Sequence, residues 1–122
     1  MNRQAFERIV AEAIDELPQA YLDRLDNVEI VVETIANPET LREARVRDPM
    51  GLLGFYHGIP LTERGLGYNL VLPDKISIYQ LPIERICRTP EAIRIQVKRT
   101  VIHELAHHFG IDDDRLRQLG AY

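Results

Sequence analysis

Apolar residues recur at helical spacing near the start of the chain. Between Asn2 and Leu17 they are three or four positions apart, which is typical of one face of an amphipathic helix. Pro18 is expected to end this helix, because proline cannot continue helical hydrogen bonding. The apolar positions are Phe6, Ile9, Val10, Ala13, Ile14 and Leu17.

A second helix is predicted from Thr89 to Gly110. Thr89-Pro90-Glu91 offers a capping hydroxyl, a proline at the first helical position and an acid in the first turn. Gly110 suits a left-handed C-cap, because it has no side chain to clash there. Apolar residues cover more than one narrow stripe, so this helix is expected to be buried on most sides. They are Ile93, Ile95, Val97, Val101, Ile102, Leu105, Ala106 and Phe109.

The segment from Val28 to Thr34 is rich in β-branched residues and roughly alternates, which predicts a strand. Leu52 to His57 and Lys75 to Tyr79 suggest two more strands, joined by a connection that contains glycine and proline. The charged stretch from Leu41 to Met50 is interpreted as a loop or one short helix.

In the last strand, Ile76 and Ile78 share one face, which we expect to be buried. Lys75, Ser77 and Tyr79 share the other, which we expect to be open. Alternation of this kind predicts a half-buried strand.

Composition limits the classes of function. With 122 residues, of which 45% are hydrophobic, the chain fits one domain over residues 1–122. Its 15 basic and 19 acidic residues are spread along the chain and give a net charge of -4, which argues against a nucleic-acid partner. The longest apolar runs, such as Ile30-Val31-Val32, are too short to cross a membrane, and no signal peptide is evident. A cytoplasmic location is expected, and the single Cys87, interpreted as structural, agrees with it.

The second helix carries a polar stripe of Gln96, Thr100, His103 and His107, spaced by four, three and four residues. Two histidines one turn apart can bind one zinc ion. In an apolar, buried helix, a pair of histidines without partners would otherwise lower the stability of the fold. Glu104 lies about 100° further round the helix, off the metal but beside it, which suits a general base.

A catalytic zinc typically has three protein ligands and a water. Asp112, Asp113 and Asp114 follow Gly110, where a reversed chain can return to the metal. Asp113 gives the pattern His-Glu-x-x-His-x-x-Gly-x-x-Asp, which parallels the metzincin arrangement. We favour Asp113 as the third ligand and leave Asp112 and Asp114 open as alternatives.

Residues Val101 to Leu116 resemble the signature of the bacterial minimal zincin-like metallopeptidases, and so do Gly58 to Arg64 and Leu72 to Ile76 upstream. The resemblance covers roughly the whole chain. It implies a compact α/β (α+β) fold, a minimal zincin fold in which a small mixed β-sheet packs on an N-terminal backing helix and a central active-site helix. It also implies one Zn²⁺ per chain, with His103, His107 and Asp113 as ligands and Glu104 as base. Larger metzincins have a methionine turn after the ligands, whereas Met1 and Met50 both precede them here, so the floor of this site must be built differently.

The expected activity is zinc-dependent hydrolysis of peptide bonds by a metal-activated water, with Glu104 as general base. A peptide or unfolded protein is expected to lie along an open edge of residues 75–80, where Ser77 and Tyr79 are the substrate-binding candidates. The side chains considered as donors to the oxyanion are not assigned that role. They are His57, Tyr79, His108 and Tyr122.

Two other functions use the same residues. One is a catalytically weak or inactive zinc-binding module for protein interaction, although Glu104 would be superfluous there. The other is hydrolysis of a non-peptide amide or ester. No nucleic-acid or membrane partner is expected, and a monomer is compatible with the sequence, which does not determine the oligomeric state.

Overall fold

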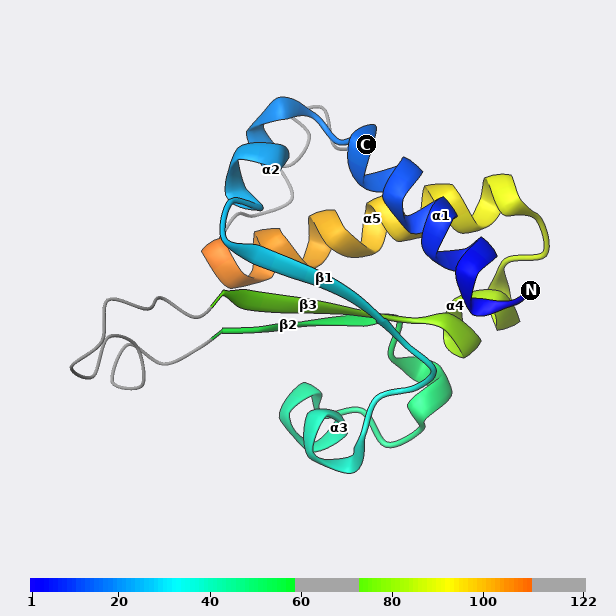
Figure 1. Cartoon of the computed structure of the whole chain (residues 1–122). Helices are drawn as coiled ribbons and strands as arrows, with labels where there is room; N and C mark the ends of the chain where they lie inside the picture. Colours follow the sequence, from blue (N-terminus) through cyan, green and yellow to red (C-terminus); the bar gives the residue numbers. More distant parts are fainter. Residues whose placement is uncertain (59–72, 111–122) are drawn as a thin grey trace.

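Helices pack on both faces of a small sheet in the computed structural model, which describes residues 1–58 and 73–110 (Figure 1). Helices α1 and α5 lie on one face, and α3 lies on the other. The elements are α1 (Arg3–Asp15), α2 (Gln19–Arg24), β1 (Val28–Glu33), α3 (Pro38–Ala44), the 3-10 turn η1 (Pro49–Gly51), β2 (Gly54–His57), β3 (Asp74–Tyr79), α4 (Gln80–Ile86) and α5 (Pro90–Phe109).

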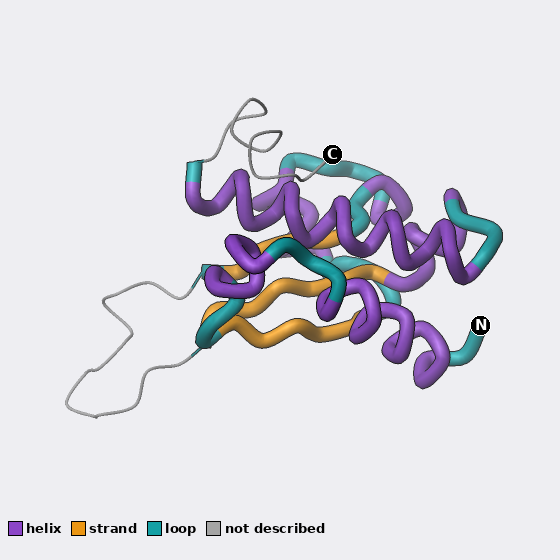
Figure 2. The backbone as a smooth tube through the Cα atoms, turned by 90° about the horizontal axis from the view of Figure 1, so that it is seen from above, coloured by secondary structure: helices purple, strands orange, loops and turns teal. Residues whose placement is uncertain are grey.

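The three strands form a mixed sheet in the order β1-β3-β2 (Figure 2). β1 is parallel to β3, with Ile30 opposite Ile76, and β2 is antiparallel to β3, with Tyr56 opposite Ile76. The predicted mixed sheet is therefore confirmed. The predicted open edge of residues 75–80 was wrong, because β3 is the central strand and pairs on both sides.

Both faces of β3 are buried. Ile76 and Ile78 are fully buried as predicted, but Ser77 and Tyr79 are 0% and 1% exposed, so the prediction of an open face was wrong for these two. The reason is a second apolar cluster on the α3 side of the sheet, which encloses Tyr79. It consists of Ala36, Leu41 and Tyr79, with Val46, Leu52 and Phe55 packed against them.

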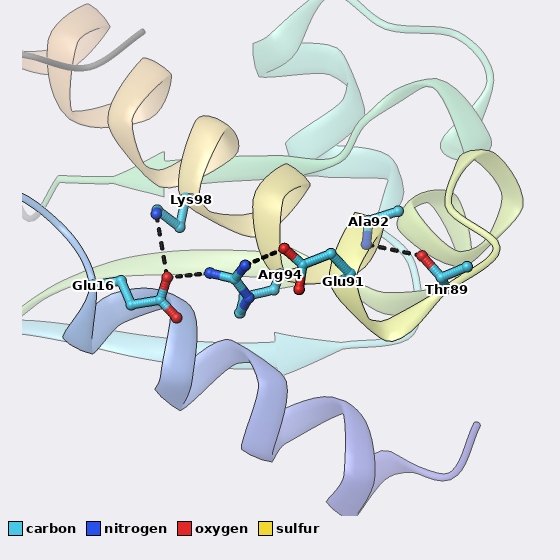
Figure 3. Close-up of polar contacts among 6 residues, drawn as sticks. All are labelled: Glu16, Thr89, Glu91, Ala92, Arg94 and Lys98. Atoms are coloured by element: carbon cyan, nitrogen blue, oxygen red, sulfur yellow. Dashed lines mark hydrogen bonds and ion pairs between the residues drawn. The ribbon is translucent and has the colours of Figure 1, made fainter.

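Helix α1 packs against α5 over the main core. Its first turn is capped by Asn2, whose side chain accepts a hydrogen bond from the Ala5 amide at 2.8 Å. It ends at Asp15, two residues before the predicted end, although Leu17 is still buried. Just past the helix, Glu16 contacts Arg94 and Lys98 of α5, which fixes the two helices together at this point (Figure 3).

Helix α5 has the predicted bounds. Thr89 accepts a hydrogen bond from the Ala92 amide at 3.1 Å (Figure 3). Gly110 adopts a left-handed conformation with φ of 69°. Burial on most sides is confirmed, but one stripe along the helix is exposed, including Ile95, and so is Phe109 at its end. The exposed stripe consists of Glu91, Ile95, Arg99, His103 and His107.

Two short helices, α2 and α4, were not predicted, because neither has enough residues to show a helical period. The predicted loop or short helix between Leu41 and Met50 contains the end of α3 and the start of η1. Within residues 1–58 and 73–110, no helix is long and apolar enough to span a membrane.

Candidate active site

His103 and His107 lie on the exposed stripe of α5, in one unbroken helix. A separation of four residues places the two imidazoles one helical turn apart on the same side. The two histidines were expected in the core, where unpaired polar groups are costly, but both are exposed to solvent, so this expectation was wrong. Their accessibility leaves both rings able to reach a metal ion from outside the core.

The Glu104 carboxylate is half-buried and reaches the outer edge of β2. Its Oε1 accepts a hydrogen bond from the backbone amide of Tyr56 at 2.9 Å. Burial raises the pKa of Glu104, while the Tyr56 amide and His107 act in the opposite direction. A carboxylate with a raised pKa is a better proton acceptor near neutral pH than one in water.

Gly54 explains how β2 comes so close to α5. A Cβ atom at this position would lie 2.6 Å from Thr100 Cγ2 and 3.0 Å from the Ser77 carbonyl oxygen. Only glycine fits without displacing a neighbour, and Thr100 is one turn before Glu104 on the same helix. The absence of a side chain at Gly54 therefore lets the Tyr56 amide reach the Glu104 carboxylate.

The Tyr56 side chain anchors the end of α5. Its ring stacks on His108 with 3.9 Å between centroids and meets Phe109 edge-on at 6.3 Å. Its hydroxyl donates to Asp74 Oδ2 at 2.6 Å, and Arg24 lies 4.8 Å from the centre of the Phe109 ring. The last turn of α5, which includes His107, is thus packed against β2 and α2.

A cleft of about 710 Å³ runs between the end of α3, the strand β2 and the second half of α5. No strand among the described residues pairs with the outer edge of β2, which borders this cleft. Both His107 and Glu104 lie in the cleft wall. The lining residues are Glu43, Ala44, Arg45, Leu52, Phe55, Tyr56, Glu104, His107 and His108.

The sequence-predicted substrate residues lie elsewhere. Ser77 and Tyr79 are buried in β3 and do not line the cleft. Ser77 Oγ is 3.3 Å from Nε2 of His57, a half-buried side chain whose pKa is lowered by burial and by Lys75. Burial also raises the pKa of Tyr79. With no open face or edge on β3, the reason for assigning Ser77 and Tyr79 to substrate binding is gone.

The predicted third ligand, Asp113, and the alternatives Asp112 and Asp114 lie outside the described residues, as does Tyr122. Within residues 1–58 and 73–110, no three histidine, cysteine or acidic side chains are grouped so that they could hold a metal ion. Cys87 is buried away from the cleft, and burial raises the pKa of its thiol, in agreement with a structural role.

The roles of Gly54 and Tyr56 were not predicted from the sequence. A glycine inside a predicted strand often marks a close approach of another segment, and that signal was available at Gly54. Nothing local could have identified the Tyr56 amide, because any residue there would offer the same backbone group.

Comparison with known families gives the site its context. Residues 25–121 match the family described as zincin-like metallopeptidase. The chain belongs to the zincin-like metallopeptidase family. The matched region includes all three strands and the whole of α5, so it contains His103, Glu104 and His107. No curated protein matches the chain.

Membership of the zincin-like metallopeptidase family indicates, at a coarse level, a zinc-dependent hydrolase of peptide bonds. The compact mixed α/β architecture agrees with this family.

Proposed function

We propose that this protein is a zinc peptidase in which His103 and His107 bind one Zn²⁺ per chain, Asp113 completes the protein ligands and Glu104 is the general base. The observation that carries the proposal is the position of Glu104. Its carboxylate lies in the wall of the same cleft as His107, and the Tyr56 amide fixes it at 2.9 Å. We expect the protein to act in the cytoplasm, an expectation that rests on the sequence alone.

The described side chains suit zinc. His103 and His107 offer two imidazole donors on the solvent side of a rigid helix, an arrangement that zinc accepts readily. Gly110 ends that helix in the left-handed conformation that allows the chain to turn. A carboxylate ligand six residues after His107 is consistent with this turn.

Bound zinc would supply Lewis acidity that polarises a carbonyl oxygen and makes water easier to deprotonate. Glu104 would accept the proton of the attacking water and pass it to the leaving amine. The Tyr56 amide holds Oε1, so the second carboxylate oxygen is available for that proton. Burial favours the protonated state that Glu104 must adopt between the two transfers.

We propose that the peptide lies along the outer edge of β2, in place of the edge of β3 expected from the sequence. β2 is antiparallel to β3 and borders the cleft, so an added strand would pass close to both His107 and Glu104. Side chains of an added strand alternate between the two faces of the sheet. Those on the α3 side would meet Leu52 and Phe55.

The proposal is tested by measuring zinc content and hydrolysis of unfolded protein and short peptides with the same preparation. We expect one zinc per chain, hydrolysis that is lost on chelation, and recovery when zinc is returned. His103→Ala and His107→Ala should each lose bound zinc and hydrolysis, and Arg99→Ala, on the same exposed stripe, should keep both. Stable zinc binding without hydrolysis of any peptide would favour the protein-interaction module. Hydrolysis of esters or non-peptide amides alone would contradict the proposal that the substrate is a peptide.

The third ligand is tested separately. Asp113→Ala should weaken zinc retention far more than Asp112→Ala or Asp114→Ala in a competition with a chromogenic chelator. Loss of the carboxylate that binds the metal removes a metal–ligand bond, whereas the neighbouring acids contribute only long-range charge. Equal effects of the three substitutions would exclude Asp113 as the specific ligand.

A further inference from the structure

A second cavity lies on the opposite edge of the sheet, between α1 and β1. Its volume is about 530 Å³. Figures 1 and 2 show α1 running alongside β1, which is the outermost strand on this side. We call this cavity the α1/β1 groove. Its lining residues are Glu7, Val10, Ala11, Ile14 and Asp15 of α1, and Ile30, Val31 and Val32 of β1.

The groove contains an accessible peptide group of β1. Arg3 Nη1 donates a hydrogen bond to the Val32 carbonyl at 2.8 Å. The Tyr79 amide of β3 lies nearest to this carbonyl in the register, but it donates to the Leu53 carbonyl on the β2 side of the sheet. The Val32 carbonyl therefore points to the outer edge. Peptide groups two residues apart in a strand point to the same edge, so the amide and carbonyl of Ile30 also point outward. No strand of the described residues pairs with this edge.

The floor of the groove is apolar. Ile30, Val31 and Val32 line the groove and are only partly buried, and Ile30 and Val32 also pack against the main core. Ala11 is exposed on the α1 side, and its short side chain leaves the groove open over these residues. An edge strand of this kind is a ready template for pairing with another extended segment.

Two carboxylates stand in the α1 wall of the groove. Glu7 and Asp15 are eight residues apart on one helix, a distance of about 12 Å along its axis. Neither forms an ion pair with a described residue. The nearest cations on the helix are Arg3 and the exposed Arg8. Arg3 donates hydrogen bonds to Val32, Thr34 and Gln80. The lining itself carries two negative charges and no positive one.

We propose that the α1/β1 groove docks an extended segment of a partner protein with the pattern basic-x-apolar-x-basic. Basic residues four apart in a strand are separated by about 13 Å and point to the same side, which matches the separation of Glu7 and Asp15. The middle apolar side chain points to that side too and would enter the groove over Ala11. The segment pairs through its backbone with Ile30, as in strand addition.

This docking site is separate from the catalytic cleft. β1 and β2 are the two outer strands, with β3 between them, and none of the groove residues lines the cleft. Docking is therefore expected to be independent of zinc. It would let a partner, including a protein substrate, be held on one side of the molecule while the cleft remains free.

The test uses a fluorescent peptide containing Lys-Thr-Val-Thr-Lys and measures its anisotropy with the full-length protein, with and without a zinc chelator. Binding is expected in both conditions and should be lost when glutamates replace the two lysines. Glu7→Gln and Asp15→Asn should each weaken binding roughly twofold to fivefold, the usual range for exposed charge pairs. Glu12→Gln, an exposed change elsewhere on α1, should have no effect.

A substitution that fills the groove is expected to weaken peptide binding more than the charge substitutions do. Ala11→Phe places an aromatic ring where the middle valine would dock and should reduce binding tenfold or more, whereas Ala20→Phe, at an exposed alanine of α2, should not. Binding that Ala11→Phe leaves unchanged would overturn the proposal, as would equal affinity for the glutamate peptide. Concentration-dependent dimerisation in sedimentation, abolished by Ala11→Phe, would identify a second copy as the occupant and also overturn it.

Discussion

The two outer edges of the sheet are both contacted by side chains from helices, but in opposite senses. At β2, the Glu104 carboxylate accepts a hydrogen bond from the Tyr56 amide. At β1, the Arg3 guanidinium donates to the Val32 carbonyl and also to Gln80 and Thr34. The β2 edge thus holds an anionic group that can move a proton, whereas the β1 edge holds a cation whose hydrogen bonds are all structural.

The difference also appears in the packing behind each edge. β2 lies close against α5 because Gly54 has no side chain, and the contact places its backbone beside Glu104, the proposed base. Between β1 and α1 lies the α1/β1 groove, where Ala11 is exposed. The proposed reaction site lies where β2 and α5 are in close contact, and the proposed docking site lies in the groove between β1 and α1. Substitutions that separate β2 from α5, or that fill the α1/β1 groove, test this distinction.

The largest effect is expected from Gly54→Ala. The new Cβ would lie 2.6 Å from Thr100 Cγ2, so a neighbour must shift, and we expect β2 to move away from α5. We expect a loss of about 1–3 kcal/mol in the free energy of unfolding, as for overpacking in a core. Peptide hydrolysis should fall tenfold or more, because the Tyr56 amide is displaced from Glu104. Denaturant unfolding and steady-state kinetics measure the two effects.

Two further variants identify the cause of the Gly54→Ala effect. Gly51→Ala is the matched control, since its Cβ would meet Val46 Cγ1 at an ordinary 3.5 Å. Thr100→Ser removes the clashing methyl group and should restore part of the activity when combined with Gly54→Ala. A double variant no better than Gly54→Ala alone would show that the contact with Thr100 is not what limits activity.

A change at the β1 edge should affect stability without affecting catalysis. Arg3→Met removes three side-chain hydrogen bonds, including the one to Val32, and should lower the free energy of unfolding by about 1–2 kcal/mol. Hydrolysis by the folded protein should stay within twofold of the parent. Arg8→Met, at an exposed position of the same helix, is the control. A large loss of turnover in Arg3→Met would mean that the two edges are coupled.

A smaller effect is expected at the end of α5. His108→Ala removes the ring stacked 3.9 Å from Tyr56 and should cost about 0.5–1.5 kcal/mol of stability. It should also speed the release of zinc, because His107 lies in the same helical turn. His108→Phe keeps an aromatic ring and should restore the slow release. Failure of this rescue would show that the imidazole acts in another way.

The smallest effect concerns the stability of the metal-free protein. Burial raises the pKa of Glu104 above its ordinary value of 4.5, so the folded state binds a proton more tightly than the unfolded state. The stability that protonation contributes is complete below 4.5 and is lost as the pH rises through the folded pKa. Glu104→Gln should therefore be more stable than the parent at neutral pH, with a difference that disappears in acid. Thermal unfolding of both proteins from pH 4 to pH 8, roughly the window of a raised carboxyl pKa, measures this difference.

The sequence predicted the features that depend on neighbouring residues. Thr89 and Gly110 mark the ends of α5 because caps are local, and the predicted bounds agree with the observed helix. The order of strands is not local. Residues 75–79 alternate like a half-buried strand, yet β3 is central and Ser77 and Tyr79 are buried, because α3 and its apolar cluster cover the second face.

In the candidate site, too, the features that depend on neighbouring residues were predictable, and those that depend on tertiary packing were not. The spacing of His103, Glu104 and His107 is a helical property, so their relation to one another was predictable. The direction in which they face was not, and the two histidines are exposed where burial was expected. The hydrogen bond between Tyr56 and Glu104 joins residues 48 positions apart and depends on tertiary packing at Gly54.

The most direct test of the central claim is the turnover of Glu104→Gln at the same zinc occupancy as the parent protein. Glutamine can still accept the Tyr56 hydrogen bond but cannot accept a proton from water, so the geometry is retained and the base is lost. We predict that the rate of peptide hydrolysis falls by roughly 10²–10⁴, the usual contribution of a general base, while zinc content and fold are unchanged. Hydrolysis at the parent rate by a fully zinc-loaded Glu104→Gln protein would contradict the account.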